Sequence, residues 1–97
     1  MQISIAIAQT RPRKGDYAAN LGHIGAIFDQ LNTLEQCPDV LVFPETILTG
    51  YFLEGGVREV ARSTADVATD LQAAYLQTCD TDVPPLDVVV GFYERYR

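Results

Sequence analysis

The sequence predicts an α/β fold, and three observations support this prediction. Residues 2–8, 39–44 and 87–93 are short apolar segments rich in β-branched residues, as is typical of strands buried in a sheet. Apolar side chains recur at helical spacing between the first two segments and again between the last two. A strand, a helix and a parallel strand form the βαβ unit, whose crossover is right-handed in nearly all known cases. We therefore expect a βαβαβ segment with largely parallel strands.

The first strand and the first helix have clear patterns. Isoleucine alternates with serine and alanine over residues 3–8, which makes one strand face bulky and the other small. Residues 9–16 are polar and are expected to form a loop that ends in Asp16, the N-cap of the helix. The helix should begin at Tyr17, and Pro38 forbids its continuation. Its apolar positions are Tyr17, Leu21, Ile24, Phe28 and Leu31, with Ile27 and Leu34 widening the stripe.

A carboxylate lies at the end of the second expected strand. Pro44 follows residues 40–43, lacks an amide hydrogen and therefore ends the strand pairing. Glu45 comes next, at the carboxyl end of the strand, which is where ligands bind in open α/β sheets. Glu45 is therefore the first candidate for chemistry, although a glutamate that closes a strand is more often a solvated surface group or a helix-terminus partner.

Two further helices are expected before the third strand. Residues 52–56 should form a loop and residues 57–62 a short helix. Ser63 or Thr64 can then cap a longer helix that ends near Cys79. One side of this helix carries Val67, Leu71, Ala74, Tyr75 and Thr78.

The sequence offers no pattern for a metal or a cofactor. Several aspartates lie within residues 80–87, but the glycine and glutamate offsets of a calcium loop are missing, so a solvated turn is the better interpretation. Cys37 and Cys79 form no metal-ligand pattern and do not indicate a disulfide scaffold, and His23 has no second candidate ligand nearby. No glycine-rich phosphate-binding motif follows a strand, which argues against a nucleotide. We expect no metal and no cofactor.

Composition and charge describe one small globular domain. The 97-residue chain is 47% hydrophobic and 21% charged, which is ordinary globular composition. A formal net charge of -6 and the lack of a basic stripe argue against nucleic acid as a partner. The chain has no apolar run near the roughly 20 residues that span a bilayer, and its start lacks the layout of a secretion signal. We therefore expect a cytoplasmic protein with no membrane partner.

The residues around Glu45 resemble a known family. The Phe43–Glu45 segment, followed after three residues by Thr49–Tyr51, resembles the amino-terminal part of the nitrilase, or carbon-nitrogen hydrolase, superfamily. The resemblance runs from Ile3 to about Arg95 and implies an α-β-β-α sandwich whose second sheet comes largely from later sequence. It implies that residues 1–97 are the amino-terminal part of a single hydrolase domain, and we expect a homo-oligomer.

The resemblance also implies an activity and a set of site residues. Members of the family hydrolyse non-peptide carbon-nitrogen bonds in small-molecule amides, carbamoyl compounds or nitriles, using a glutamate, a lysine and a cysteine. By resemblance Glu45 is the general base, and Tyr51 belongs to a turn that shapes the substrate pocket. Glu94, in a segment that matches a later family strand, is a candidate for the supporting shell, with a structural ion pair to a neighbouring arginine as the alternative.

Two of the three catalytic groups of the family have no match. Lys14 is the only lysine, and it lies in the loop after the first strand, where the family does not place its catalytic lysine. Cys37 and Cys79 are expected at helix ends, not in a strand-to-helix nucleophile turn. We therefore expect the chain to be the amino-terminal third or so of a hydrolase and to be inactive alone.

Two other interpretations stay open at this point. The glutamine-hydrolysing domain of a glutamine-dependent synthetase has closely similar strand and Phe-Pro-Glu patterns. A non-catalytic α/β interaction domain, acidic and oligomeric, would need Glu45 only as a polar strand end.

Overall fold

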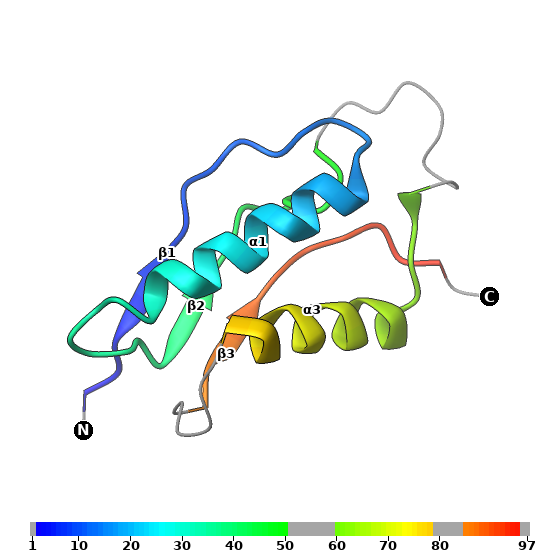
Figure 1. Cartoon of the computed structure of the whole chain (residues 1–97). Coiled ribbons are helices and arrows are strands. Elements are labelled where there is room, and N and C mark those ends of the chain that lie inside the picture. The colour runs from blue at the N-terminus through cyan, green and yellow to red at the C-terminus, as the bar shows by residue number, and fades with distance from the viewer. Residues whose placement is uncertain (1, 51–59, 79–84, 96–97) are drawn as a thin grey trace.

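Three short parallel strands form a sheet, and two helices cover one of its faces (Figure 1). The computed structural model describes residues 2–50, 60–78 and 85–95. The predicted α/β class with parallel strands is confirmed, although the strands are shorter than predicted. In chain order the elements are β1 (Ile5–Ile7), α1 (Tyr17–Leu31), β2 (Val40–Val42), α3 (Thr64–Thr78) and β3 (Asp87–Val89).

The strand β2 lies in the centre of the sheet. It pairs in parallel with β1 on one side and with β3 on the other. Hydrogen bonding continues one residue past the strand, because the Phe43 amide donates to the Val89 carbonyl at 3.0 Å. Pro44 follows and has no amide hydrogen, so the ladder ends there. The residue after Pro44 therefore lies at the carboxyl edge of the sheet, on its central strand.

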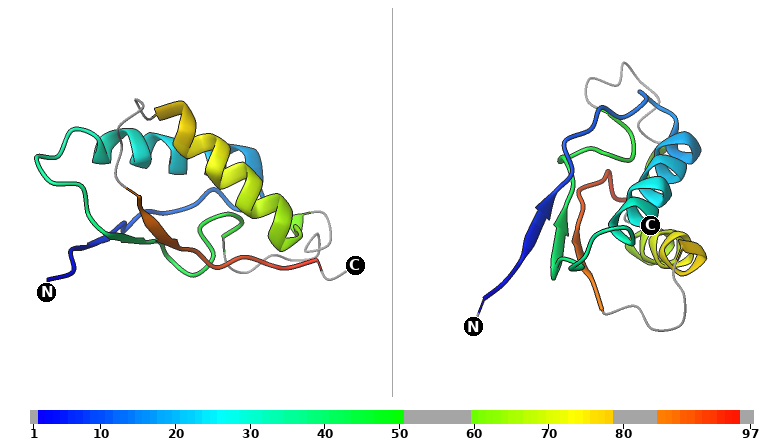
Figure 2. Two further views of the ribbon diagram at one scale, coloured as in Figure 1. Left: turned by 90° about the horizontal axis from the view of Figure 1, so that it is seen from below. Right: turned by 60° about the vertical axis from the view of Figure 1, so that its left-hand side comes forward.

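The two faces of the sheet differ in what covers them. Leu41 is buried on the face that meets the helices, and Ala6 beside it packs against the same core. On the other face Ile5 and Ile7 are 60% and 70% exposed. Figure 2 shows α1 and α3 together on one side of the sheet. The alternation in β1 predicted a bulky and a small face, and the small face meets the helices because alanine allows their close approach.

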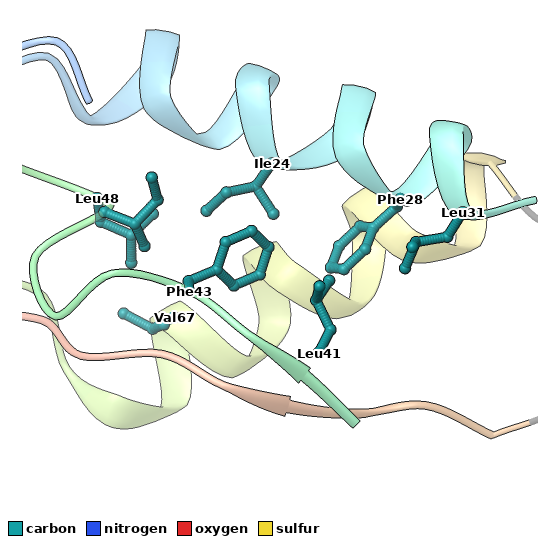
Figure 3. Packing of buried hydrophobic residues seen from close by; sticks show 8 residues of the cluster. Ile24, Phe28, Leu31, Leu41, Phe43, Leu48 and Val67 are labelled. Atoms are coloured by element: carbon teal, nitrogen blue, oxygen red, sulfur yellow. The ribbon is translucent and has the colours of Figure 1, made fainter. Parts of the chain in front are cut away.

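The core lies between α1 and β2 (Figure 3). The Phe28 ring packs edge to face against Phe43, with 6.3 Å between ring centroids, and against Tyr75 of α3 at 5.1 Å. Such aromatic pairs contribute about 0.5–1.5 kcal/mol beyond the area they bury. Because the core also includes Ile47 and Leu48, the segment that follows β2 is fixed by burial. The remaining buried members of the cluster are Ile24, Leu31, Leu41 and Val67.

Side chains cap both helices at their starts. The predicted N-cap of α1 is confirmed, because the Asp16 carboxylate accepts a hydrogen bond from the Ala19 amide at 3.0 Å. Of the two residues proposed to cap the second long helix, Ser63 is the cap, and its hydroxyl accepts from the Asp66 amide at 3.1 Å. Thr64 is the first residue of α3.

The first helix ends earlier than the apolar stripe suggested. α1 stops at Leu31, well before Pro38. The Thr33 hydroxyl donates to the Gln30 carbonyl at 2.7 Å and so offers this carbonyl a partner other than the next helical amide. Leu34, which was predicted to widen the stripe, is 52% exposed as a result.

The chain before α3 pairs with the chain after β3. Residues 57–59 of the predicted short helix lie outside the described residues, and at Arg62 the prediction of helix is wrong. The Arg62 amide donates to the Tyr93 carbonyl at 3.0 Å, and the Arg95 amide donates to the Arg62 carbonyl at 2.8 Å. Residues 79–84, including most of the predicted polar turn, are also outside the described part. Within the part of the chain that the structure describes, no helix is long and apolar enough to cross a membrane.

A polar contact joins the two helices. The Tyr17 hydroxyl at the start of α1 donates to the Asp70 carboxylate of α3 at 2.6 Å. The Arg62 guanidinium lies over the Tyr17 ring, 4.4 Å from its centroid. Burial, together with the hydrogen bond to Asp70 and the charge of that carboxylate, raises the pKa of Tyr17 above its ordinary value.

The Tyr17→Phe substitution tests this contact through its pH dependence. Loss of the hydrogen bond should lower the free energy of unfolding by about 1 kcal/mol near neutral pH. Because the folded-state pKa is raised, the contribution is complete below about pH 10, where tyrosine in an unfolded chain titrates, and is lost as the pH rises through the folded-state value. Urea denaturation at several pH values should show the two proteins converging above about pH 10. A difference that grows in that range would contradict the assignment.

The open face of the sheet predicts self-association of the isolated chain. Ile5, Ile7 and Val89 are all more than half exposed there, and contiguous apolar patches drive association. Sedimentation velocity should therefore show oligomers at micromolar concentration, and Ile5→Lys should shift the chain towards monomer. The matched control is Leu76→Lys, because Leu76 is 65% exposed but lies on α3. A wild-type chain that sediments as a compact monomer and melts cooperatively would rule the prediction out.

Candidate functional site

Glu45 lies where the sequence placed it, at the carboxyl end of the central strand. It follows Pro44 directly after the last ladder hydrogen bond of β2. Its side chain is exposed, whereas residues 46–50 immediately after it are all buried. The carboxylate is thus accessible, and its backbone leads directly into a buried turn. We call residues 44–50 the Glu45 turn.

Backbone hydrogen bonds close the Glu45 turn on itself. The Ile47 amide donates to the Pro44 carbonyl at 3.2 Å, and the Gly50 amide donates to the Thr46 carbonyl at 2.7 Å. Gly50 has a φ of 80°, a conformation that residues with a side chain rarely adopt. Among the described residues, the buried Thr46 hydroxyl oxygen has no hydrogen-bond partner. Main-chain hydrogen bonds therefore order the turn, and the Thr46 hydroxyl makes no hydrogen bond within the described residues.

The loop after β1 packs directly on this turn. The Gly15 amide donates to the Thr49 carbonyl at 2.8 Å. A Cβ atom at Gly50 would lie 3.3 Å from the Lys14 Cα, so the two main chains are in contact. Lys14 does not match the catalytic lysine of the family, and no local pattern predicted that this loop would lie beside the Glu45 turn.

On its other side the Glu45 backbone meets the end of β3. A Cβ atom at Gly91 would lie 3.1 Å from the Glu45 carbonyl carbon and closer still to the carbonyl oxygen. Such contacts are shorter than real Cβ atoms tolerate, so only glycine fits at this position. Gly91 therefore sets how closely the segment after β3 approaches Glu45. The sequence showed a glycine in the third strand but not the segment that it faces.

Of the other two predicted site residues, only Glu94 is among the described residues. Tyr51 lies outside the described residues. Glu94 accepts a hydrogen bond from the Thr64 hydroxyl at the start of α3. The neighbouring Arg95 pairs with Asp66 at 3.6 Å, and both side chains are exposed. Glu94 as a supporting residue stays a prediction. The alternative for Glu94, a structural ion pair with a neighbouring arginine, also stays a prediction.

The cysteines and the histidine lie away from the Glu45 turn or outside the described part. Cys37 is a half-buried free thiol that precedes β2, at the end of the strand opposite to Glu45. Cys79 is outside the described residues. His23 is exposed, and its Nε2 atom is 2.9 Å from the Thr10 hydroxyl. Within residues 2–50, 60–78 and 85–95, no group of three or more histidine, cysteine or acidic residues is placed to hold a metal ion.

A cavity of about 360 Å³ lies between β1 and α1, but it is separate from the predicted chemistry. Its walls are mainly apolar, with the Thr10–His23 pair among its polar members. Glu45 is not among the lining residues. The cavity lies beside β1, which is an edge strand of the sheet. At the carboxyl edge, in contrast, the backbone of a charged residue makes specific contacts with a neighbouring segment.

Comparison with protein-family models, with curated protein sequences and with solved structures finds no significant match. The class that the fold and the site define is therefore an α/β protein with an accessible carboxylate at the carboxyl edge of a parallel sheet. Such a carboxylate can accept a proton and return it. Any assignment to a family rests on the residues themselves.

Two glycine substitutions test the backbone contact at Glu45. Gly91→Ala should lower the free energy of unfolding by about 1–3 kcal/mol, because the new methyl group forces the segment after β3 away from Glu45. Gly22→Ala is the matched control, since a Cβ there meets nothing within 4 Å and alanine should stabilise α1 by about 0.5–1 kcal/mol. Urea denaturation of both variants measures the difference. Equal stability of Gly91→Ala and the wild type would show that the close contact is not real.

Proposed function

We propose that this chain is the amino-terminal part of a carbon-nitrogen hydrolase of the nitrilase superfamily, acting on a small-molecule amide, carbamoyl compound or nitrile. The observation that carries the proposal is the position of Glu45. It is an accessible carboxylate at the carboxyl end of the central parallel strand, next to a turn fixed by burial. The Phe43–Glu45 segment, which resembles the family, lies at that strand end, and Thr49 and Gly50 lie in the turn.

In the proposed reaction Glu45 moves protons. It takes the proton of a cysteine thiol, and the thiolate forms a bond to the substrate carbon. A lysine stabilises the negative charge that develops on the substrate oxygen. For an amide, the protonated Glu45 then gives its proton to the leaving amine as the carbon-nitrogen bond breaks, and water releases the acyl group from sulfur. The thiol and the lysine would come from polypeptide other than residues 1–97, with Tyr51 shaping the pocket and Glu94 supporting the site.

The open face of the sheet supports the same proposal. An α-β-β-α sandwich needs a second sheet packed on the face that the helices do not cover. In this chain that face presents Ile5, Ile7 and Val89, all largely exposed. A second sheet would bury them, and a cytoplasmic homo-oligomer is the assembly that we propose.

The same face is also the observation that favours a second candidate. A non-catalytic α/β interaction domain would use the exposed isoleucines to bind a partner, and Glu45 would then be a polar strand end. The glutamine-hydrolysing domain of a synthetase would keep the chemistry of Glu45 and differ in the fate of the released ammonia. Both enzymes would need Glu45 for turnover, whereas the interaction domain would not, so the dependence of turnover on Glu45 separates the enzymes from the interaction domain.

The Glu45→Gln substitution tests the proposal in a polypeptide that also carries the thiol and the lysine. Glutamine keeps the shape of the side chain but cannot accept the proton, so kcat should fall by about 10²- to 10⁴-fold. Thermal stability should change little, because Glu45 is exposed. Glu35→Gln, another exposed glutamate, is the matched control and should leave kcat unchanged. Near-normal turnover in a folded Glu45→Gln protein would rule out the catalytic role and favour the interaction domain.

A further inference from the structure

A buried carboxamide lies between the loop after β1 and the Glu45 turn. Asn20, in the first turns of α1, is only 2% exposed. It lies on the helix face that carries the apolar positions Tyr17 and Ile24, three residues before it and four after it. Burying an amide in such a place costs free energy unless its hydrogen bonds are made. A polar residue at a core position therefore needs a specific explanation.

The partners of this carboxamide lie in two different segments. Its Oδ1 accepts from the Arg13 amide at 2.6 Å, and its Nδ2 donates to the Arg13 carbonyl at 2.7 Å. The same Nδ2 donates to the Leu48 carbonyl at 2.9 Å. One side chain on α1 thus binds the loop after β1 and the Glu45 turn at once. Both donor hydrogens are used, so the amide is matched to these main-chain groups.

We propose that Asn20 is a positioning residue, which couples the loop of residues 9–16 to the Glu45 turn so that the two segments are held as one unit. The Gly15–Thr49 hydrogen bond and the contact between Lys14 and Gly50 join the same two segments beside it. The coupling itself does not depend on the proposed function. It also fixes the backbone that leads to Glu45, and the importance of this for catalysis rests on the proposed function.

Hydrogen-deuterium exchange of the 97-residue chain, followed by mass spectrometry, measures the coupling at low micromolar concentration. In Asn20→Ala the amides of residues 10–16 and 44–50 should exchange about 10- to 100-fold faster, as expected when buried groups lose their partners. Residues 64–78 should be unchanged. Unaltered exchange in either of the two coupled segments would overturn the proposal.

Asn32, the C-cap residue directly after α1, provides a control. Its Nδ2 also donates to a main-chain carbonyl of another element, that of Thr78, at 2.6 Å. Asn32→Ala should therefore speed exchange only near the ends of α1 and α3. If it also speeds exchange in the Glu45 turn, the effect of Asn20→Ala reflects general loss of stability and the proposal is wrong.

Asn20→Asp keeps the test decisive if Asn20→Ala fails to fold. Aspartate retains the acceptor for the Arg13 amide but, when ionised, opposes the carbonyls of Arg13 and Leu48. When protonated, it can donate one hydrogen bond again. The exchange of residues 44–50 relative to wild type should therefore slow on acidification, with residues 64–78 unaffected. Burial of the charge alone would lower stability generally and change the exchange of residues 64–78 to the same extent. A pH-independent ratio overturns the proposal.

The two proposals fail separately. Loss of turnover in Glu45→Gln together with unaltered exchange in the Asn20 variants would keep the hydrolase and remove Asn20 from its positioning role. Faster exchange with normal turnover in Glu45→Gln would keep the coupling and remove its catalytic consequence.

Discussion

The contact of Phe28 with Phe43 is the interaction on which the rest of this structure depends. Phe28 comes from the buried side of α1, and Phe43 continues the central strand by one residue. Their edge-to-face packing fixes the helix over the strand, and Tyr75 extends the same aromatic cluster to α3. Glu45 is only two residues beyond Phe43. Apolar packing in the middle of the chain therefore places the carboxylate, before any polar contact of the site is considered.

Local patterns were enough to predict the two long helices and the positions of the three strands, but not the chain around Arg62. The spacing from Tyr17 to Leu31 and the Asp16 cap predicted α1, because helix period and capping act within a few residues. The same patterns did not show where α1 ends, since the Thr33 hydroxyl competes with the helix for a backbone carbonyl. They also left open which face of β1 meets the helices. That choice depends on how closely another layer can approach Ala6, and neighbouring residues do not specify it.

The site was less predictable than the fold, because its contacts are long in sequence and made by main chain. Glu45 was found because proline and a strand end are local signals. The contacts of Gly91 with Glu45 and of Lys14 with Gly50 have no such signal, since each joins segments more than thirty residues apart. Asn20 could have been singled out as an asparagine between apolar helix positions, but its partners could not be named from the sequence. For Glu94 the situation is reversed, because a motif suggested the residue but its hydrogen bond is to Thr64 at the start of α3.

Within the described residues, the fully buried core cluster comes mainly from residues 24–48. Of the buried core cluster among the described residues, only Val67 comes after residue 50. Most of the fully buried residues are therefore synthesised before α3 and β3, and amino-terminal units generally fold first during synthesis. The backbone around Glu45 nevertheless reaches its final position late, because the hydrogen bond from Phe43 to Val89 and the contact with Gly91 need the segment after α3. During that interval the isoleucines of β1 are exposed as well, and exposed apolar surface makes a partly folded chain prone to aggregation.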